Sequence, residues 1–378
     1  MKVYNQIIYI ITSLSAHGAQ KNLCRFIEKS TKYDIKNICV YTLKDFDRSS
    51  YIYKKISSNG VNIVKLDGFE FFRLLSKKIL KKQFCKNESI VLFAWMYHSM
   101  FVSFFLKYFI YHNSKLLWTL RHGEPFHEGI QFKTRIIIFF DLLIHRIFNV
   151  PALVNSRKGL ISHTSIGFKK NLLYLWPNFL PDHRLKPLIN NFSTDKEIKL
   201  LYPARYHAQK NHIMALEVLK ILLYDFDISA KLILVGDGID TLFSNLTKSK
   251  QFHSILEYVS FLPSTSNIRQ YYYDSDIVIS TSSFGEGLQN IIIEALIYGK
   301  LVFSTSAGDA SEILTSKFIV KTNQSYDMAS SIANCLFSMR ELSDHENPYM
   351  HDYSEQYKKL IQFCDVSDLF SIFNKALK

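Results

Sequence analysis

The chain has 378 residues, more than one hydrophobic core usually supports, so its length predicts two domains. Its 48% hydrophobic and 21% charged residues exclude an intrinsically disordered protein. The net charge of +13 comes from the first half alone: residues 1–178 hold 27 Lys and Arg against 10 Asp and Glu, which predicts an anionic partner for that half.

The cysteines and the apolar segments indicate the cellular compartment in which the protein works. Its five cysteines are an odd number without CxxC spacing, which argues against a disulfide framework or a zinc site and suits a reducing cytosol. The first apolar run, residues 7–11, is too short for a secretory signal and predicts a buried strand. No uninterrupted apolar run approaches the roughly 18 residues of a spanning helix, so we expect no integral membrane protein.

Short apolar runs alternate with longer segments of helical pattern through the first half of the chain. They predict β-strands at residues 7–12, 35–43, 61–66, 89–95, 115–120 and 152–156. Continuous apolar strands that alternate with helices are typical of a parallel sheet covered on both faces.

Three helical segments of the first half are unusual in composition. Residues 69–86 interleave apolar side chains with lysines, the pattern either of an interfacial helix or of a surface helix with a solvated basic face. Residues 98–112 and 134–148 are apolar nearly all round. For these two we expect buried helices, with contact to lipid as the alternative.

The second half shows the same alternation. Its strands are expected at residues 199–205, 230–238, 254–262, 275–282 and 300–306. Residues 176–197 combine three prolines with polar residues and predict the joint between the halves. We therefore expect an α/β protein with two Rossmann-like domains facing across a cleft. The predicted boundaries are 1–178 for the N-terminal domain, 179–345 for the C-terminal domain, and 346–378 for a helical segment that packs back on the first.

Four features of the second half follow one another in a consistent order. First comes a cationic turn with Arg205 and Lys210 between a strand and a helix. A Gly-Asp-Gly turn after a strand and an acidic turn before another strand follow. Last comes a glycine turn around Glu286 that opens an apolar helix containing Glu294. Taken singly, each feature is common on protein surfaces or in unrelated folds.

Together the four features indicate a site for a nucleotide diphosphate. Helix N-termini after glycine turns present backbone N–H groups to phosphate, and Arg205 and Lys210 would neutralise the diphosphate. Glu294, about two turns into its helix, would accept hydrogen bonds from a ribose diol, and Glu286 would bond the hydroxyls of a donor sugar. A buried unpaired carboxylate costs several kcal/mol, so Glu294 also needs a partner within the protein.

The sequence resembles a known family through "ARYHAQKN" (204–211), "LILVGDG" (232–238) and "EGLQNIIIEA" (286–295). In this order they are similar to the retaining, metal-independent glycosyltransferases of the GT-B fold, the family-4 group, which commonly build capsule, O-antigen and lipopolysaccharide chains. The last segment matches that family's two glutamates separated by seven residues. The resemblance covers most of residues 115–315, including "WTLRHG" (118–123).

The resemblance implies roles for individual residues. It implies catalytic roles for His122, near the donor sugar, and for Glu286; a structural His122 packed beside Arg121 is the alternative. Gly18 belongs to the loop that would meet the acceptor or a phosphate. The implied donor-binding residues are Arg205, Lys210, Gly287, Leu288 and Glu294.

The chain departs from the family pattern at several positions. In "SAHGAQKN" (15–22), His17 replaces the first glycine of the family's loop and Gln20 replaces its acid, although Gly18 and the following helix still offer backbone amides. Phe179 stands where the family has glycine after Pro-Asn, and Pro263 where relatives often carry glycine near the base-binding loop.

These observations predict an enzyme, a glycosyltransferase. It would move a sugar from a nucleotide-diphosphate sugar to a hydroxyl of a lipid-linked saccharide, with retention and, as the resemblance implies, with no metal or other cofactor. The basic first half predicts a peripheral protein on the anionic cytoplasmic face of the inner membrane, where each Lys or Arg near the surface contributes about 1 kcal/mol. No nucleic-acid partner is expected, because no recognised binding module is present.

The alternatives belong to other classes. A sugar phosphorylase or a sugar-nucleotide epimerase would share the GT-B scaffold. A basic protein that binds nucleic acid or membrane without turnover would explain the charge, and a lectin-like protein would bind the donor without transfer.

Overall fold

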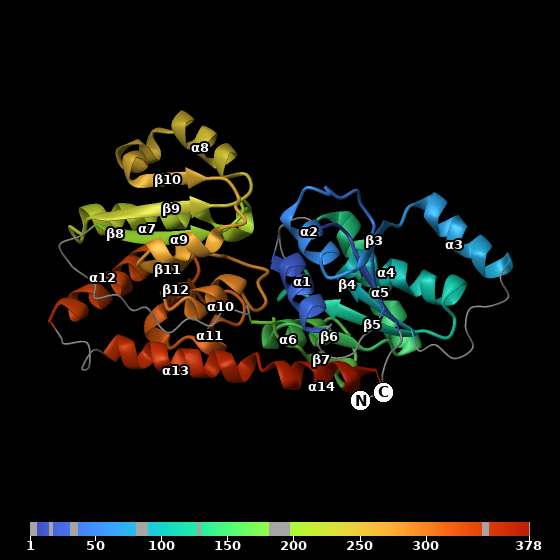
Figure 1. The fold of residues 1–378 in the computed structure, drawn as a ribbon. Helices are drawn as coiled ribbons and strands as arrows, with labels where there is room; N and C mark the ends of the chain where they lie inside the picture. Colours follow the sequence, from blue (N-terminus) through green and yellow to red (C-terminus); the bar gives the residue numbers. More distant parts are fainter. Residues whose placement is uncertain are drawn as a thin grey trace. The chain divides into compact units, whose positions relative to one another are not determined.

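The computed structural model describes residues 6–14, 18–30, 37–80, 90–126, 130–180, 197–341 and 348–377. The chain divides into two compact units (Figure 1). Unit 1 comprises residues 1–179 and 364–378, and unit 2 comprises residues 180–363. The chain thus leaves unit 1 next to the predicted boundary at residue 178.

Unit 1 is built on a seven-stranded parallel sheet in the order β3-β2-β1-β4-β5-β6-β7 (Figure 1). Six of its strands correspond to the predicted apolar runs, whereas the three-residue β7 was not predicted. The strands are β1 (Gln6–Ile11), β2 (Asn37–Thr42), β3 (Asn62–Lys65), β4 (Ile90–Trp95), β5 (Lys115–Leu120), β6 (Ala152–Val154) and β7 (Leu173–Leu175).

Helices connect these strands, as parallel pairing requires. They are α1 (Gly18–Ser30), α2 (Tyr51–Ser57), α3 (Gly68–Leu80), α4 (Tyr97–Phe105), α5 (Phe132–Phe148) and α6 (Arg157–Ser165). Unit 1 also contains α14 (Val366–Ala376), which follows unit 2 in the sequence. A π-helical turn, η2 (Leu106–Ile110), continues α4, and a 3-10 turn, η3 (Lys170–Leu172), precedes β7.

The sheet of unit 1 has a core on each face, because side chains of a strand alternate between the faces. Ile7, Tyr9 and Ile11 of β1 pack in one cluster with side chains of α1 and α14. Ile8 and Ile10 pack in the other cluster with side chains of α4 and α5. The first apolar run is therefore a buried central strand, as predicted.

The two segments that are apolar nearly all round are not buried helices. In α5 only Ile138, Asp141 and His145 are buried, and in η2 Tyr108 and Phe109 are 41% and 52% exposed. Each segment packs one face into the core of unit 1 and leaves apolar side chains exposed on the other, so the expectation of burial was wrong. In the basic segment 69–86, α3 ends at Leu80, Phe69 and Phe72 are exposed, and residues 81–86 lie outside the described part.

Unit 2 is built on a six-stranded parallel sheet in the order β10-β9-β8-β11-β12-β13. The strands are β8 (Ile198–Pro203), β9 (Ala230–Val235), β10 (Val259–Leu262), β11 (Ile277–Ser280), β12 (Leu301–Thr305) and β13 (Ile319–Val320). Residues 254–262 were predicted as one strand, but their first half belongs to the 3-10 segment η5 (Lys250–Tyr258). The two-residue β13 was not predicted.

The remaining helices of unit 2 pack around this sheet (Figure 1). They are α7 (His212–Tyr224), α8 (Ile239–Lys248), α9 (Ile268–Asp274), α10 (Asn290–Ile297), α11 (Ala310–Ile313), α12 (Ser325–Glu341) and α13 (Pro348–Phe363). Two further 3-10 turns are η4 (Ala208–Lys210) and η6 (Ser316–Phe318).

The C-terminal segment 346–378 does not act as one body. Its first helix, α13, packs on α10 and α11 of unit 2, and only its second helix, α14, packs on β6 and β7 of unit 1. Cys24, Cys39, Cys335 and Cys364 are free and buried, and Cys85 lies outside the described residues. Within the described ranges, no helix is long and apolar enough to cross a membrane.

Candidate functional site

The predicted site residues of unit 2 follow the carboxyl ends of β8 and β11. These strands are neighbours in the sheet, and the chain continues from β8 to β9 on one side and from β11 to β12 on the other. This is the topological switch point, next to which open α/β sheets bind their ligands. Residues 204–211 follow β8 and residues 281–289 follow β11.

The turn that carries Lys210 is fixed by hydrogen bonds to both strands. The carbonyl oxygen of Lys210 accepts from the hydroxyl of Tyr202 at 2.5 Å and from that of Thr281 at 3.0 Å. The backbone N–H of Ser283 donates to the carbonyl of Gln209 at 2.8 Å. The side chain of Lys210 therefore projects from a rigid turn, which immediately precedes the N-terminus of α7.

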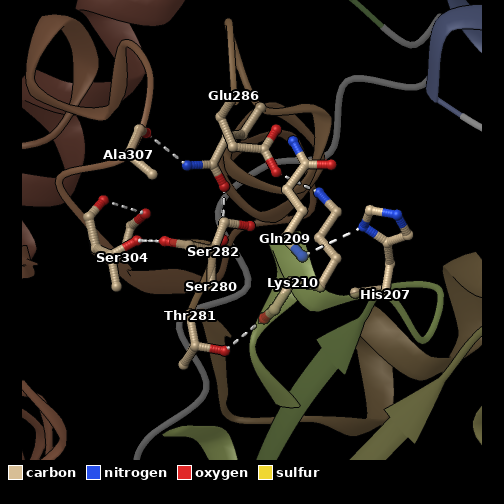
Figure 2. A network of polar contacts seen from close by, with 12 residues as sticks. His207, Gln209, Lys210, Ser280, Thr281, Ser282, Glu286, Ser304 and Ala307 are labelled. Carbon is tan, nitrogen blue, oxygen red and sulfur yellow. Dashed lines mark hydrogen bonds and ion pairs between the residues drawn. The ribbon is translucent and has the colours of Figure 1, made fainter. Parts of the chain in front are cut away.

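Lys210 and Glu286 form an ion pair across the switch point. Nζ of Lys210 donates to Oε1 of Glu286 at 2.6 Å (Figure 2), and the two side chains are 22% and 11% exposed. Burial, the largest single cause, would lower the pKa of Lys210, but the attraction of Glu286 and Tyr202 and the hydrogen bond to Glu286 together outweigh it and raise that pKa above its ordinary value. Lys210 thus stays cationic, beside a carboxylate that can accept hydrogen bonds.

The loop of Glu286 is held by a buried glutamine. Oε1 of Gln289 accepts from the hydroxyl of Ser280 at 2.6 Å, and its Nε2 donates to the carbonyl of Ala307 at 2.8 Å. Gln289 therefore ties residues 285–289 to the ends of β11 and β12. The sequence reasoning did not select Ser280 or Gln289, because polar residues in a loop carry no signal of burial.

Gly308 was also missed, although it is essential to the packing of this loop. A Cβ atom on Gly308 would lie 2.1 Å from the carbonyl oxygen of Gly287 and 2.9 Å from Cβ of Glu286. The backbone N–H of Asp309 donates to the same carbonyl at 3.1 Å. The one available signal was a glycine three residues after the end of an apolar strand, in "SAGDA" (306–310).

Glu294 is buried and has a protein partner, as its apolar surroundings required. It is 6% exposed, and its Oε2 accepts from the hydroxyl of Tyr272 in α9 at 3.1 Å. Because α10 begins at Asn290, Glu294 is its fifth residue, a little over one turn from the N-terminus and not two. The Tyr272 bond fixes the orientation of the carboxylate.

Arg205 lies on the same turn as Lys210 and is exposed. The turn passes close over the end of β9, since a Cβ on Gly236 would lie 2.2 Å from the carbonyl oxygen of Ala204 and 2.9 Å from the N atom of Arg205. The backbone N–H of Tyr206 also donates to the carbonyl of Asp237 at 2.8 Å. The Gly-Asp-Gly turn therefore supports the backbone that presents Arg205.

In unit 1, His122 follows β5 and stacks on a tyrosine. Its ring lies 6.0 Å from that of Tyr97, with 9° between the planes. The Tyr97 hydroxyl donates to Nε2 of His163 at 2.7 Å, and Nδ1 of His163 donates to the carbonyl of Gly159 at 2.6 Å. Burial lowers the pKa of His163 to about 4, which keeps it neutral and able to accept this bond. Tyr97 was not selected from the sequence.

Arg121, the neighbour of His122, packs elsewhere. Its guanidinium lies 4.4 Å from the ring of Trp95 and 5.0 Å from that of Trp176, and it donates to Oδ1 of Asn178 at 2.8 Å. Burial lowers the pKa of Arg121 to about 9. Gly18 begins α1, and residues 15–17 before it, including His17, lie outside the described part.

Potential metal ligands among the described residues gather away from this switch point. His351, Asp352 and Glu355 of α13 have ligand atoms within 4.8 Å of one another, but Asp352 is paired with Lys317 and Glu355 with Lys359. The sequence contains Asp-x-Asp triplets, one of them at 274–276. That triplet precedes β11 and so lies at the opposite edge of the sheet from Glu286.

The structure thus brings together Lys210 and Glu286 with Gly287 and Leu288, whereas Gly18 and His122 belong to unit 1. Residues 197–337, which contain this arrangement, match the family model described as "Glycosyl transferases group 1". Unit 2 therefore carries a region similar to the group 1 glycosyltransferases. The match confirms the predicted enzyme class.

Solved structures resemble this glycosyltransferase over its whole length. HepE of Anabaena, in complex with UDP and glucose, has a TM-score of 0.78 at 16% identity and covers 99% of each chain. A point mutant of TarM from S. aureus, in complex with Fondaparinux, alpha-GlcNAc-glycerol and UDP, has a TM-score of 0.75 at 11% identity and covers 99% of this chain and 100% of its own.

A third structure is WaaG, a glycosyltransferase involved in lipopolysaccharide biosynthesis, with a TM-score of 0.65 at 12% identity and 98% of each chain covered. These likenesses confirm the predicted GT-B fold. A search of the curated proteins finds no match to the sequence.

Proposed function

We propose that this glycosyltransferase moves a sugar from a nucleoside-diphosphate sugar to a hydroxyl group of a saccharide acceptor. The observation that carries the proposal is the Lys210–Glu286 pair at the switch point of unit 2, inside a group 1 glycosyltransferase domain. HepE, which has the same fold, binds UDP-glucose in one of its structures.

The chemistry of the pair suits a leaving diphosphate. When a diphosphate binds at the N-terminus of α7, Lys210 would exchange its bond to Glu286 for one to a phosphate oxygen and stabilise the charge that grows on departure. Glu286 would then accept hydrogen bonds from hydroxyl groups of the donor sugar. Arg205 is placed to add a second positive charge, and Glu294, oriented by Tyr272, to accept from the ribose.

The proposal extends to the stereochemistry, the metal requirement, the acceptor and the location of the reaction. We propose transfer with retention, without a bound metal, to a lipid-linked saccharide of the kind found in lipopolysaccharide, O-antigen or capsule. His122, supported by Tyr97, would position the donor sugar, and the backbone amides after Gly18 would meet the acceptor. The enzyme would work on the cytoplasmic face of the inner membrane, with the basic first half toward anionic lipid.

The first test is a thermal-shift panel with UDP, GDP, ADP and CMP on the full chain. A ligand at 100 times its dissociation constant stabilises a protein by about 2.7 kcal/mol. We expect one nucleoside diphosphate to shift the unfolding of the wild type. The shift should weaken in Lys210→Met, because a charge-assisted hydrogen bond of about 1.5–3 kcal/mol is lost. It should also weaken in Glu294→Ala.

A matched ion pair elsewhere in unit 2 provides the control. Nζ of Lys231 lies 2.9 Å from Oε2 of Glu197, and the two side chains are 45% and 31% exposed. Lys231→Met removes the same charge without touching the switch point, so it should leave the ligand shift unchanged. If none of the nucleotides shifts the folded wild type, or if both lysine variants weaken the shift equally, the proposed site is wrong.

A further inference from the structure

Helix α5 carries a stripe of large apolar side chains on its outer face. Their exposed fractions range from 38% for Leu143 to 75% for Phe132. At about 100° per residue they share one sector of the helix about 100° wide. We call this set the α5 stripe: Phe132, Ile136, Phe139, Phe140, Leu143 and Ile147.

Two polar side chains of α5, by contrast, lie on its inner face. Asp141 and His145 are fully buried together with Ile138, roughly opposite the α5 stripe. A helix between a protein core and water places its apolar side inward and its polar side outward. The arrangement in α5 therefore does not suit an outer face in water.

The α5 stripe continues onto the neighbouring helical segments. Phe101 of α4 lies 6.1 Å from Phe140 of the stripe and 5.0 Å from Phe105, measured between ring centroids, and Phe105 stacks on Phe109 of η2 at 6.1 Å. Phe105 and Phe109 are 38% and 52% exposed. The apolar surface thus spans α4, η2 and α5. Soluble proteins normally expose large apolar side chains singly and not as a continuous surface of this kind.

Charged residues at the edges of the α5 stripe are basic. Lys133 flanks it on one side, and Arg135 and Arg146 flank it on the other; all three are exposed. Asp141 is the one acidic residue within α4, η2 and α5, and it is buried. An exposed apolar stripe between basic residues is the pattern of a helix that lies in the headgroup region of an anionic bilayer.

We propose that the surface formed by α4, η2 and α5 inserts into the interface of an anionic lipid bilayer, with α5 parallel to the membrane plane. The inference rests on the proposed function, since it names the surface at which a lipid-linked acceptor would be met. A second copy of the chain is a less suitable partner for this surface than an anionic bilayer, because a symmetric contact through α5 would bring the basic edges of two stripes together.

A tryptophan in the α5 stripe tests this inference directly. The three native tryptophans, Trp95, Trp118 and Trp176, are fully buried, so their emission is insensitive to an added membrane. In Phe139→Trp we expect a blue shift of the emission when vesicles of phosphatidylglycerol and phosphatidylcholine are added, because the new indole enters an apolar layer. Phe243→Trp, at an exposed phenylalanine of unit 2, is the matched control and should not shift.

Vesicle flotation measures the affinity. We expect the triple variant Ile136→Ser, Phe139→Ser, Leu143→Ser to lose at least tenfold in binding to the same vesicles. Lys133→Gln with Arg135→Gln should weaken binding to the anionic vesicles and leave the weak binding to pure phosphatidylcholine unchanged.

Two outcomes would overturn the inference. One is equal emission shifts in Phe139→Trp and Phe243→Trp, or none in either. The other combines three results: the wild type is dimeric by light scattering without lipid, the triple variant is monomeric, and the two proteins bind vesicles equally well. Since the nucleotide-induced thermal shift depends on unit 2, its persistence in the triple variant separates failure at the membrane surface from failure of the proposed function.

Discussion

At the scale of single residues, two glycines with the same backbone conformation serve different ends. Gly308 and Gly60 have φ values of +69° and +72°, a region that other residues adopt at a cost. A Cβ on Gly60 would meet nothing within 4 Å, whereas a Cβ on Gly308 would meet backbone of the Glu286 loop at 2.1 Å. Only Gly308 is required by a close approach of two backbones.

We therefore predict that Gly308→Ala lowers the stability of the protein more than Gly60→Ala does, and that it also impairs the donor site. The left-handed conformation alone costs about 1–2 kcal/mol in either variant. In Gly308→Ala the loop of Glu286 must also move, so stability falls further and the nucleotide-induced thermal shift is lost. Equal losses of stability in the two variants, measured by chemical denaturation, with an intact nucleotide shift would contradict this reading.

At the scale of the element, α5 shows a buried acid. Asp141 is fully buried, and within the described ranges neither of its carboxylate oxygens has a hydrogen-bond partner. Burial raises the pKa of Asp141 well above its usual range. The folded state therefore favours the protonated acid, whereas the unfolded chain ionises near pH 4.

The sign of the pH dependence follows from this difference. The contribution of Asp141 to stability is fully present below the unfolded pKa and is lost as pH rises towards the folded pKa. Asp141→Asn, which is neutral at every pH, should match the wild type near pH 4 and exceed it increasingly at higher pH in urea unfolding. Asp225→Asn, at an exposed site after α7, should show no such trend, and a parallel trend in both would contradict the prediction.

At the scale of the whole molecule, unit 1 is completed by the last helix of the chain. Phe373 of α14 is 2% exposed, and its ring lies 5.4 Å from those of Phe26 and Phe93. Unit 2 is contiguous in sequence, whereas unit 1 contains both ends of the chain. The core of unit 1 therefore depends on a segment that follows unit 2 in the sequence.

We predict that Phe373→Ala destabilises unit 1 by about 3–5 kcal/mol, the usual cost of removing a buried phenylalanine. Hydrogen exchange with mass spectrometry should show lost protection in β1, β4 and α1 and little change in β8 to β12. Phe337→Ala, at a partly exposed phenylalanine of unit 2, should leave both units protected. Uniform loss of protection in Phe373→Ala would show that the two units unfold together.

Much of the fold was predictable because its signals are local. The apolar runs that became β1 to β6, β8, β9, β11 and β12 are bounded by turn residues, and parallel strands buried on both faces need such runs. Lys210 and Glu286 were found the same way, since a glycine or cationic turn between a strand and a helix is visible within ten residues. The family resemblance rests on these same short segments.

The sequence by itself thus determined the two parallel-sheet domains, the switch-point residues and the basic excess of the first half, because periodicity, turn chemistry and charge are properties of neighbouring residues. Only the tertiary structure decided which face of α5 is exposed, that Tyr272 holds Glu294, that Gly308 lies under the Glu286 loop, and that α14 completes unit 1. Each of these depends on contacts between residues far apart in the chain, and an apolar helix has the same sequence pattern whether its second face meets protein, lipid or water.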